Sequence, residues 1–206
     1  MDMQCRGFVY EQGGHNRMII ACDIDGVLND LIDKTLELYN SRTGKNIQVS
    51  DIIAYSFYEC LPQEDADGIC ELFKEKELWD SLLPFADSQW GIKTLINEGY
   101  ELYLATATHP ENFPWKVEWI KRYFPFVNTN NIICIHNKGL LKCDVIIDDC
   151  IDNLTSNICE RIVIDHPWNR GKEKDYVYDI HRAYSFKDVI NIIHNIERRD
   201  KEWEKE

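Results

Sequence analysis

The continuous apolar run Met18–Ile24 (MIIACDI) constrains the fold of this chain more than any other segment. A run of this kind, rich in β-branched residues, is typical of a strand that is buried on both faces of a parallel sheet. Asp23, Asp25 and Gly26 stand at its end, where the glycine permits a sharp turn. We therefore expect a parallel sheet covered by helices, with polar side chains gathered where this strand stops.

Strand and helix patterns alternate from residue 85 onward. The expected elements are, in chain order, a helix over 87–98, a strand over 101–105, a helix over 113–124, strands over 131–135 and 144–147, a helix over 152–157, a strand over 161–164 and a helix over 185–199. This alternation predicts an α/β fold, a Rossmann-like three-layer sandwich with a parallel sheet. The ligand site of such a sheet lies beyond the carboxyl ends of its strands.

The segment after the first strand has a different character. Residues 29–84 show helix patterns, among them one over 64–76, and no clear strand pattern, so we expect a small helical cap inserted after the first strand. Residues 18–28 and 85–206 would then form the α/β core. Residues 1–17 are polar and contain glycine, and are expected to form a mobile N-terminal extension.

The charge balance restricts the partners. The chain carries 23 Lys and Arg against 36 Asp and Glu, a formal net charge of −13, which repels a phosphate backbone, so polymeric nucleic acid is not an expected partner. Apolar runs stay far below the roughly 20 residues that cross a bilayer. No membrane contact is expected, and without a secretory signal pattern the expected location is cytoplasmic. The eight cysteines include no C-x-x-C pair and are expected to be reduced.

Acidic pairs end two of the expected strands. Asp23 and Asp25 are two residues apart and share one face of the first strand, while Asp148 and Asp149 follow the strand over 144–147. Four acids at one edge repel one another strongly unless a divalent cation neutralises them. Because hard oxygen ligands with room for water suit Mg²⁺, the sequence predicts a magnesium site.

A hydroxyl and an ammonium group are expected at the same edge. Thr106 ends the strand over 101–105, and Lys138 lies in the loop before the strand over 144–147. Together with a metal they suit a phosphoryl group, because both cations offset negative charge while an Asp attacks phosphorus. A carboxylate nucleophile divides hydrolysis into formation and breakdown of an acyl phosphate. Lys142 is the alternative for the lysine role, since it lies closer to the strand.

The order of these motifs, D-x-D-G-V at the first strand, Thr at the second, a single Lys and then D-D, resembles the haloacid-dehalogenase-like phosphohydrolases over most of residues 18–165. The roles that this resemblance implies are nucleophile and Mg²⁺ ligand for Asp23, acid/base and main-chain carbonyl ligand for Asp25, phosphate binding for Thr106 and Lys138, and completion of the metal site for Asp149, supported by Asp148.

A narrower resemblance rests on D-I-D-G-V-L-N-D, the helical insert after it, N-K-G before D-V-I-I-D-D, and the late D-H-P-W-N-R. These motifs are similar to the 5′(3′)-deoxyribonucleotidase (cytosolic type C) family, which implies a Mg²⁺-dependent phosphomonoesterase acting on nucleoside monophosphates, with preference for deoxypyrimidines. Leu31 stands where members place an aromatic residue, and T-A-T over 106–108 replaces T-S-P. Base selectivity therefore stays open, with Trp79 as the expected stacking residue and Phe57 or Tyr58 as alternatives.

Two other functions compete with this interpretation. One is a sugar-phosphate or other small-molecule phosphatase of the same superfamily, and the other is a non-catalytic module that binds a phosphate ligand. The segment Trp168–Arg170 either touches the ligand or packs on the core, and the loop residues His109, His136 and His166 are interpreted as ordinary surface residues. The base, the sugar, the 5′ or 3′ preference and the formation of a homodimer are left open.

Overall fold

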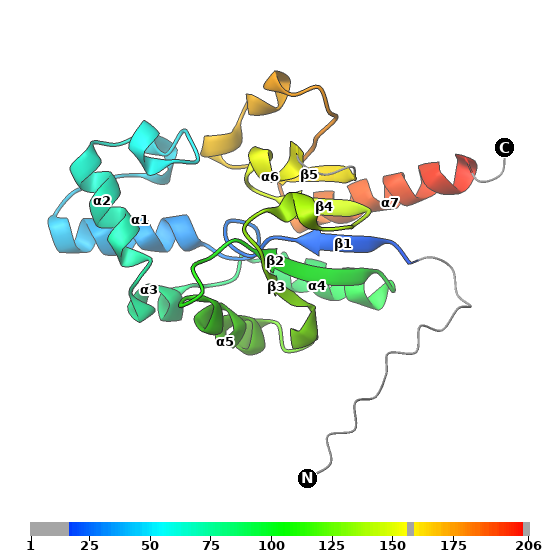
Figure 1. Cartoon of the computed structure of the whole chain (residues 1–206), viewed down its shortest axis with the longest axis horizontal. Helices are drawn as coiled ribbons and strands as arrows, with labels where there is room; N and C mark the ends of the chain where they lie inside the picture. The colour runs from blue at the N-terminus through cyan, green and yellow to red at the C-terminus, as the bar shows by residue number, and fades with distance from the viewer. Residues whose placement is uncertain (1–16, 156–158, 204–206) are drawn as a thin grey trace, which may run out of the picture.

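A six-stranded parallel sheet, in the order β3-β2-β1-β4-β5-β6, forms the centre of the protein (Figure 1). The structure is a computed structural model and describes residues 17–155 and 159–203. Its strands are β1 (Ile19–Cys22), β2 (Glu101–Thr106), β3 (Ile132–Cys134), β4 (Val145–Asp148), β5 (Glu160–Ile164) and β6 (His181–Ala183). The strand order changes direction between β1 and β4, which is where ligands bind in sheets of this kind.

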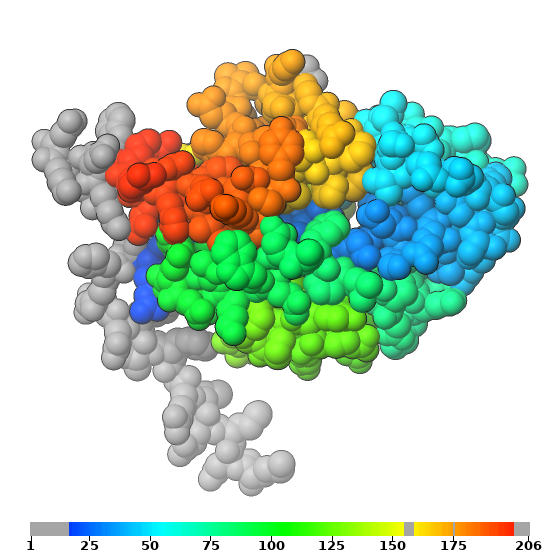
Figure 2. Space-filling model, turned by 180° about the vertical axis from the view of Figure 1, so that it is seen from behind, coloured from blue at the N-terminus to red at the C-terminus, as the bar shows by residue number. Residues whose placement is uncertain are grey.

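Alternate residues of the central strand belong to two hydrophobic clusters on opposite faces of the sheet. Ile20 and Cys22 belong to the larger cluster, which contains residues of α4, α5 and α7, whereas Ala21 belongs to a smaller cluster with α6. The helix α7 packs against α4 (Figure 2). These helices are α4 (Ser88–Asn97), α5 (Phe113–Tyr123), α6 (Ile151–Thr155) and α7 (Phe186–Trp203). The arrangement confirms the predicted Rossmann-like three-layer α/β fold.

The segment between β1 and α4 lies beyond the carboxyl ends of the strands (Figure 1). It consists of α1 (Leu31–Thr43), α2 (Gln63–Leu72), α3 (Lys76–Ser81) and 3₁₀ turns at Val49–Asp51 and Phe57–Glu59. The structure describes this segment without a gap, and no strand occurs in it. Its helical character agrees with the expected cap, while the boundaries at residues 29 and 84 stay a prediction.

Two expectations about secondary structure are wrong. The helix expected over 64–76 is interrupted between α2 and α3, where the Phe73 carbonyl accepts hydrogen bonds from Trp79 Nε1 and Asn112 Nδ2, both at 2.9 Å, in place of a helical N–H. The strand β6 was not expected, because this short edge strand carries Ala183 as its one apolar residue. The other elements match within two residues at each end that the structure describes, except that α7 extends further.

Some expectations fall outside the described part of the chain. The expected mobile extension over 1–17 lies outside the described residues except for Arg17. The expected end of the helix over 152–157 lies outside them as well. Among the helices that the structure describes, none combines the length and the apolar character needed to cross a bilayer.

The close approach of α4 to α7 predicts that Gly91→Ala destabilises the protein. A Cβ at Gly91 would overlap atoms of Phe186, including its Cβ, so that α7 would have to move. We expect the free energy of unfolding to fall by about 1–3 kcal/mol, although helix propensity alone favours Ala over Gly by about 1 kcal/mol. Urea unfolding measures the change. The exposed Asn97→Ala in the same helix should stay within about 0.5 kcal/mol of the unaltered protein, and equal stability of both variants would contradict this packing argument.

Candidate active site

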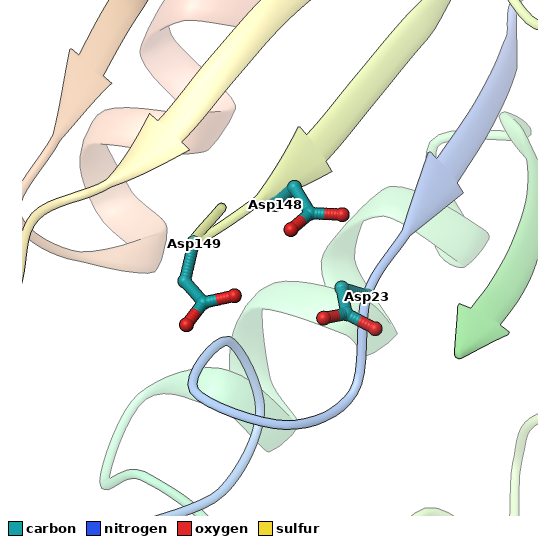
Figure 3. A group of neighbouring side chains, drawn as sticks. All are labelled: Asp23, Asp148 and Asp149. Atoms are coloured by element: carbon teal, nitrogen blue, oxygen red, sulfur yellow. The ribbon is translucent and has the colours of Figure 1, made fainter. Parts of the chain in front are cut away.

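Three buried carboxylates lie at the adjacent ends of β1 and β4 (Figure 3). Asp23 follows β1, and its backbone N–H donates to the Ile147 carbonyl at 2.9 Å, so the two strands stay paired up to the site. Asp148 closes β4 and Asp149 follows it. Each of the three offers a carboxylate oxygen, and these oxygens lie within 4.8 Å of one another. The structure thus brings the two predicted acidic motifs together at one edge of the sheet.

Lys138 supplies a buried positive charge to this group. Its Nζ lies 2.8 Å from Asp23 Oδ1 and 2.6 Å from Asp148 Oδ2, and the residue is 2% exposed. A 3₁₀ turn aims it inward, since Asn137 Oδ1 accepts from the backbone N–H of Gly139 at 3.0 Å. The alternative, Lys142, is exposed. Of the two lysines, Lys138 is the one that reaches the acids.

Burial governs the ionisation of these groups. It raises the pKa of Asp23 to about 7, against the lowering effect of Lys138 and with a further increase from Asp148. Burial, Asp148 and Asp23 together raise the pKa of Asp149 well above its usual value. Burial would lower the pKa of Lys138, but Asp23 and Asp148 raise it. Three carboxylates beside one ammonium leave an excess of negative charge in a buried place.

This donor set fits a divalent cation. The oxygens of Asp23, Asp148 and Asp149 are hard ligands close enough to share one ion, and the ion would offset their mutual repulsion. The Asp148 carboxylate also accepts from Cys150 N at 2.9 Å and from Asn153 Nδ2 at 3.1 and 3.2 Å. Asp148 is thus already bonded to Lys138, Cys150 and Asn153.

A second buried lysine, Lys116 of α5, was missed by the sequence analysis. It forms an ion pair with Asp25, its Nζ lies 2.8 Å from Thr106 Oγ1, and it is 2% exposed. Asp25 also accepts from Asn29 Nδ2 at 3.1 Å. The sequence held one signal for it. Lys116 lies three and four residues before the apolar Trp119 and Ile120, so it places a charge on the apolar, buried face of the helix.

A cavity of about 790 Å³ opens above these groups, within the size range of ligand sites. Side chains of the α/β core and of the segment between β1 and α4 line it together. The site residues in its lining are Asp23, Asp25, Lys116, Lys138 and Asp149, and the apolar residues include Leu31, Ile32, Ile52, Phe57, Phe73, Trp79, Trp115 and Trp168.

The expected stacking residues take different places. Trp79 lines the cavity but is 4% exposed; its indole N–H is bonded to the Phe73 carbonyl, and Lys116 Nζ lies 5.0 Å from the centroid of its ring. Phe57 also lines the cavity and stacks against Phe73. Tyr58 is exposed, and its hydroxyl donates to Asp67, away from the lining that the described residues form. Trp79 and Phe57 are therefore packed parts of the cavity wall.

In the segment Trp168–Arg170, the first two residues pack on the core and Arg170 is exposed. Trp168 and Asn169 are buried and both donate hydrogen bonds to Asp149, while Trp168 also lines the cavity. The interpretation of His166 as a surface residue is wrong, because its ring stacks on Trp168 with centroids 4.2 Å apart and its Nε2 lies 2.6 Å from the Gly26 carbonyl oxygen.

Comparisons with known proteins agree with this geometry. Residues 17–200 match the family model described as "5' nucleotidase, deoxy (Pyrimidine), cytosolic type C protein". A 5'(3')-deoxyribonucleotidase of Bacillus subtilis (strain 168) is 29% identical over 160 residues, which cover 77% of this chain and 91% of that protein. A 5'(3')-deoxyribonucleotidase of Clostridium acetobutylicum is 30% identical over 161 residues, covering 77% of this chain and 88% of that protein.

Solved structures share the fold at low sequence identity. A haloacid dehalogenase-like hydrolase of Streptococcus pneumoniae superposes with a TM-score of 0.63 at 13% identity, covering 86% of this chain and 98% of that one. A HAD family hydrolase of Deinococcus radiodurans R1, solved with bound phosphate and sodium, gives a TM-score of 0.59 at 12% identity. The superposition covers 84% of this chain and 93% of that one. These two likenesses support the fold.

The buried state of Asp23 predicts a pH-dependent effect of Asp23→Asn on stability without metal. The pKa of Asp23 is raised from 3.8 to about 7 on folding, so the folded chain holds a proton that the unfolded chain releases. The stability of the unaltered protein therefore falls as pH rises across this interval, whereas Asn does not titrate. In EDTA, the melting temperature of Asp23→Asn should exceed that of the unaltered protein by an amount that grows from pH 4 to pH 7.

The exposed Asp33→Asn is the matched control and should show no such growth. A gain for Asp23→Asn that is the same at every pH would contradict the buried, destabilised carboxylate.

Proposed function

The chain belongs to the family of 5' nucleotidase, deoxy (Pyrimidine), cytosolic type C proteins and is a phosphoric monoester hydrolase, and we propose that it dephosphorylates (deoxy)nucleoside 5′- and 3′-monophosphates with Mg²⁺. The observation that carries this proposal is the placing of buried carboxylates and two buried lysines under one cavity. The names of the relatives from Bacillus subtilis and Clostridium acetobutylicum support nucleotides as the substrate class.

The charges of the site suit a phosphate dianion. Lys138 lies beside Asp23, and Lys116 lies beside Asp25 and Thr106, so a phosphoryl group entering above the carboxylates would meet an ammonium group on each side. Thr106 and Lys138 keep their predicted phosphate-binding role, and we add Lys116 to it. The apolar side of the cavity would cover the nucleoside and exclude water from the reaction.

The reaction proceeds in two displacements. A carboxylate oxygen of Asp23 forms a bond to phosphorus while the bond from phosphorus to the nucleoside oxygen breaks, and Asp25 gives its proton to that oxygen. Water then attacks the phosphorus of the aspartyl phosphate, Asp25 takes the proton, and inorganic phosphate leaves with Asp23 restored. Lys138, 2.8 Å from Asp23 Oδ1, holds the nucleophile in place for both displacements.

The proposed metal ligands are the carboxylates of Asp23 and Asp149 and the main-chain carbonyl of Asp25, with Asp148 in support. When bound, Mg²⁺ offsets the negative charge that gathers on the phosphoryl oxygens. A cytoplasmic location and a homodimer stay predictions.

Phosphate release from a panel of ribo- and deoxynucleoside monophosphates and sugar phosphates tests the proposed function. We expect release from nucleoside monophosphates with Mg²⁺ and none with EDTA. Asp23→Asn should lower kcat by roughly 10³-fold or more, because no carboxylate remains to attack. Release only from sugar phosphates would favour the other phosphatase class, and release from none would favour a module that only binds phosphate.

The place of Lys116 predicts that Lys116→Met weakens catalysis. Met keeps the length of the side chain and removes the charge beside Asp25 and Thr106. A single lost charge contact to a phosphoryl group should lower kcat/KM by about 10²-fold. Lys121→Met, at an exposed position of the same helix, should leave kcat/KM unchanged. Equal kcat/KM of the two variants would show that Lys116 does not bind the phosphoryl group.

A further inference from the structure

The loop between β5 and β6 holds Asp149 from two directions. Trp168 Nε1 donates to Asp149 Oδ2 at 3.0 Å, and Asn169 Nδ2 donates to the Asp149 carbonyl oxygen at 2.8 Å. The same amide of Asn169 also donates to the Ile164 carbonyl at the end of β5, at 2.7 Å. Trp168 and Asn169 are 4% and 2% exposed. The side chain and the backbone of Asp149 are thus both tied to this loop.

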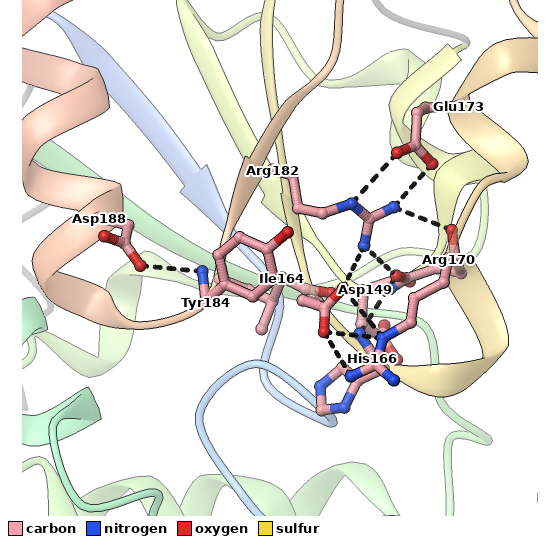
Figure 4. Close-up of polar contacts among 10 residues, drawn as sticks. Asp149, Ile164, His166, Arg170, Glu173, Arg182, Tyr184 and Asp188 are labelled. Carbon is pink, nitrogen blue, oxygen red and sulfur yellow. Dashed lines mark hydrogen bonds and ion pairs between the residues drawn. The ribbon is translucent and has the colours of Figure 1, made fainter. Parts of the chain in front are cut away.

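Arg182 of β6, which Figure 4 shows beside Glu173, in turn holds Asn169. Arg182 Nη1 donates to Asn169 Oδ1 at 2.7 Å, and Arg182 Nη2 donates to the Asn169 carbonyl oxygen at 3.0 Å. The guanidinium also forms ion pairs with Asp165 and Glu173, both at 2.7 Å, and its side chain is 14% exposed. Two carboxylates balance the charge of Arg182, while its remaining contacts go to Asn169.

The geometry points to Arg182 as a positioning residue for the metal site, acting through Asn169 on Asp149. Asp149 lies near two other carboxylates, Asp23 and Asp148, and repulsion among them would turn it away from the site unless its place is fixed. The hydrogen bonds from Arg182 to Asn169, and from the Asn169 amide to the main-chain carbonyl of Asp149, fix the backbone from which this carboxylate projects. Trp168 holds the carboxylate itself. This inference rests on the proposed function, because it assumes that Asp149 binds Mg²⁺.

The chemistry of the guanidinium explains why an arginine stands at this position. The side chain reaches four acceptor groups at once, namely the carboxylates of Asp165 and Glu173 and the two oxygens of Asn169. A planar group with five N–H donors in a fixed geometry can do this, whereas a lysine ammonium has three donors on a flexible stem. A lysine at position 182 would keep the charge and lose part of the hold on Asn169.

Calorimetric titration of the full chain with Mg²⁺, in the absence of substrate, tests this role. Arg182→Gln and Arg182→Lys should each weaken Mg²⁺ binding by about 10- to 100-fold, the usual effect of removing a group that orients a metal ligand. Arg170→Gln is the matched control, because Arg170 is 64% exposed and pairs with Asp165 from the solvent side. This control should bind Mg²⁺ as the unaltered protein does. Circular dichroism checks that each variant is folded.

The outcomes separate this inference from the proposed function. If the unaltered protein does not bind Mg²⁺, the metal-dependent function fails and the inference fails with it. If it binds Mg²⁺ and folded Arg182→Lys binds equally well, charge at position 182 is sufficient and the positioning role is wrong. Should Arg182→Gln fail to fold, Arg182→Lys and Asn169→Ser decide, and Asn169→Ser should also weaken binding because it removes the amide that donates to Asp149.

Discussion

The burial of three carboxylates at the ends of two neighbouring strands is the constraint on which the rest of this structure depends. Asp23, Asp148 and Asp149 are at most 7% exposed, and one ammonium group, Lys138, offsets part of their charge. Such a group is unfavourable for folding unless a ligand adds positive charge. The site therefore carries a cost in stability that a divalent cation would remove.

The second buried lysine connects this constraint to the cap. Lys116 forms an ion pair with Asp25, bonds to Thr106 and lies over the ring of Trp79, so one side chain of α5 contacts a core strand end, the loop after β1 and the cap helix α3. A phosphoryl group bound beside Lys116 would thus lie directly next to the apolar wall of the cavity. The charged groups and this wall are adjacent in the fold, although they come from separate parts of the chain.

The sequence predicted the parallel sheet and its acidic edge because both follow from local patterns. Continuous apolar strands fix the fold, and polar residues at their ends, such as Asp23, Thr106 and Asp149, must meet at one edge. Lys116 was missed because its role depends on how α5 packs, and the contacts of Arg182 were missed because β6 is too short to carry an apolar pattern. The interruption after α2 likewise depends on Asn112, which is 39 residues away from Phe73.

We propose above all that the acids at the ends of β1 and β4 bind a divalent cation beside a phosphoryl group. Crystals grown with Mn²⁺ and inorganic phosphate test it most directly, because Mn²⁺ is located by its anomalous scattering. We expect an anomalous peak in contact with Asp23 and Asp149, with a phosphate oxygen as a further ligand and the phosphate beside Thr106 and Lys138. Ordered phosphate in the cavity with no peak at these carboxylates, or a peak elsewhere, would contradict it.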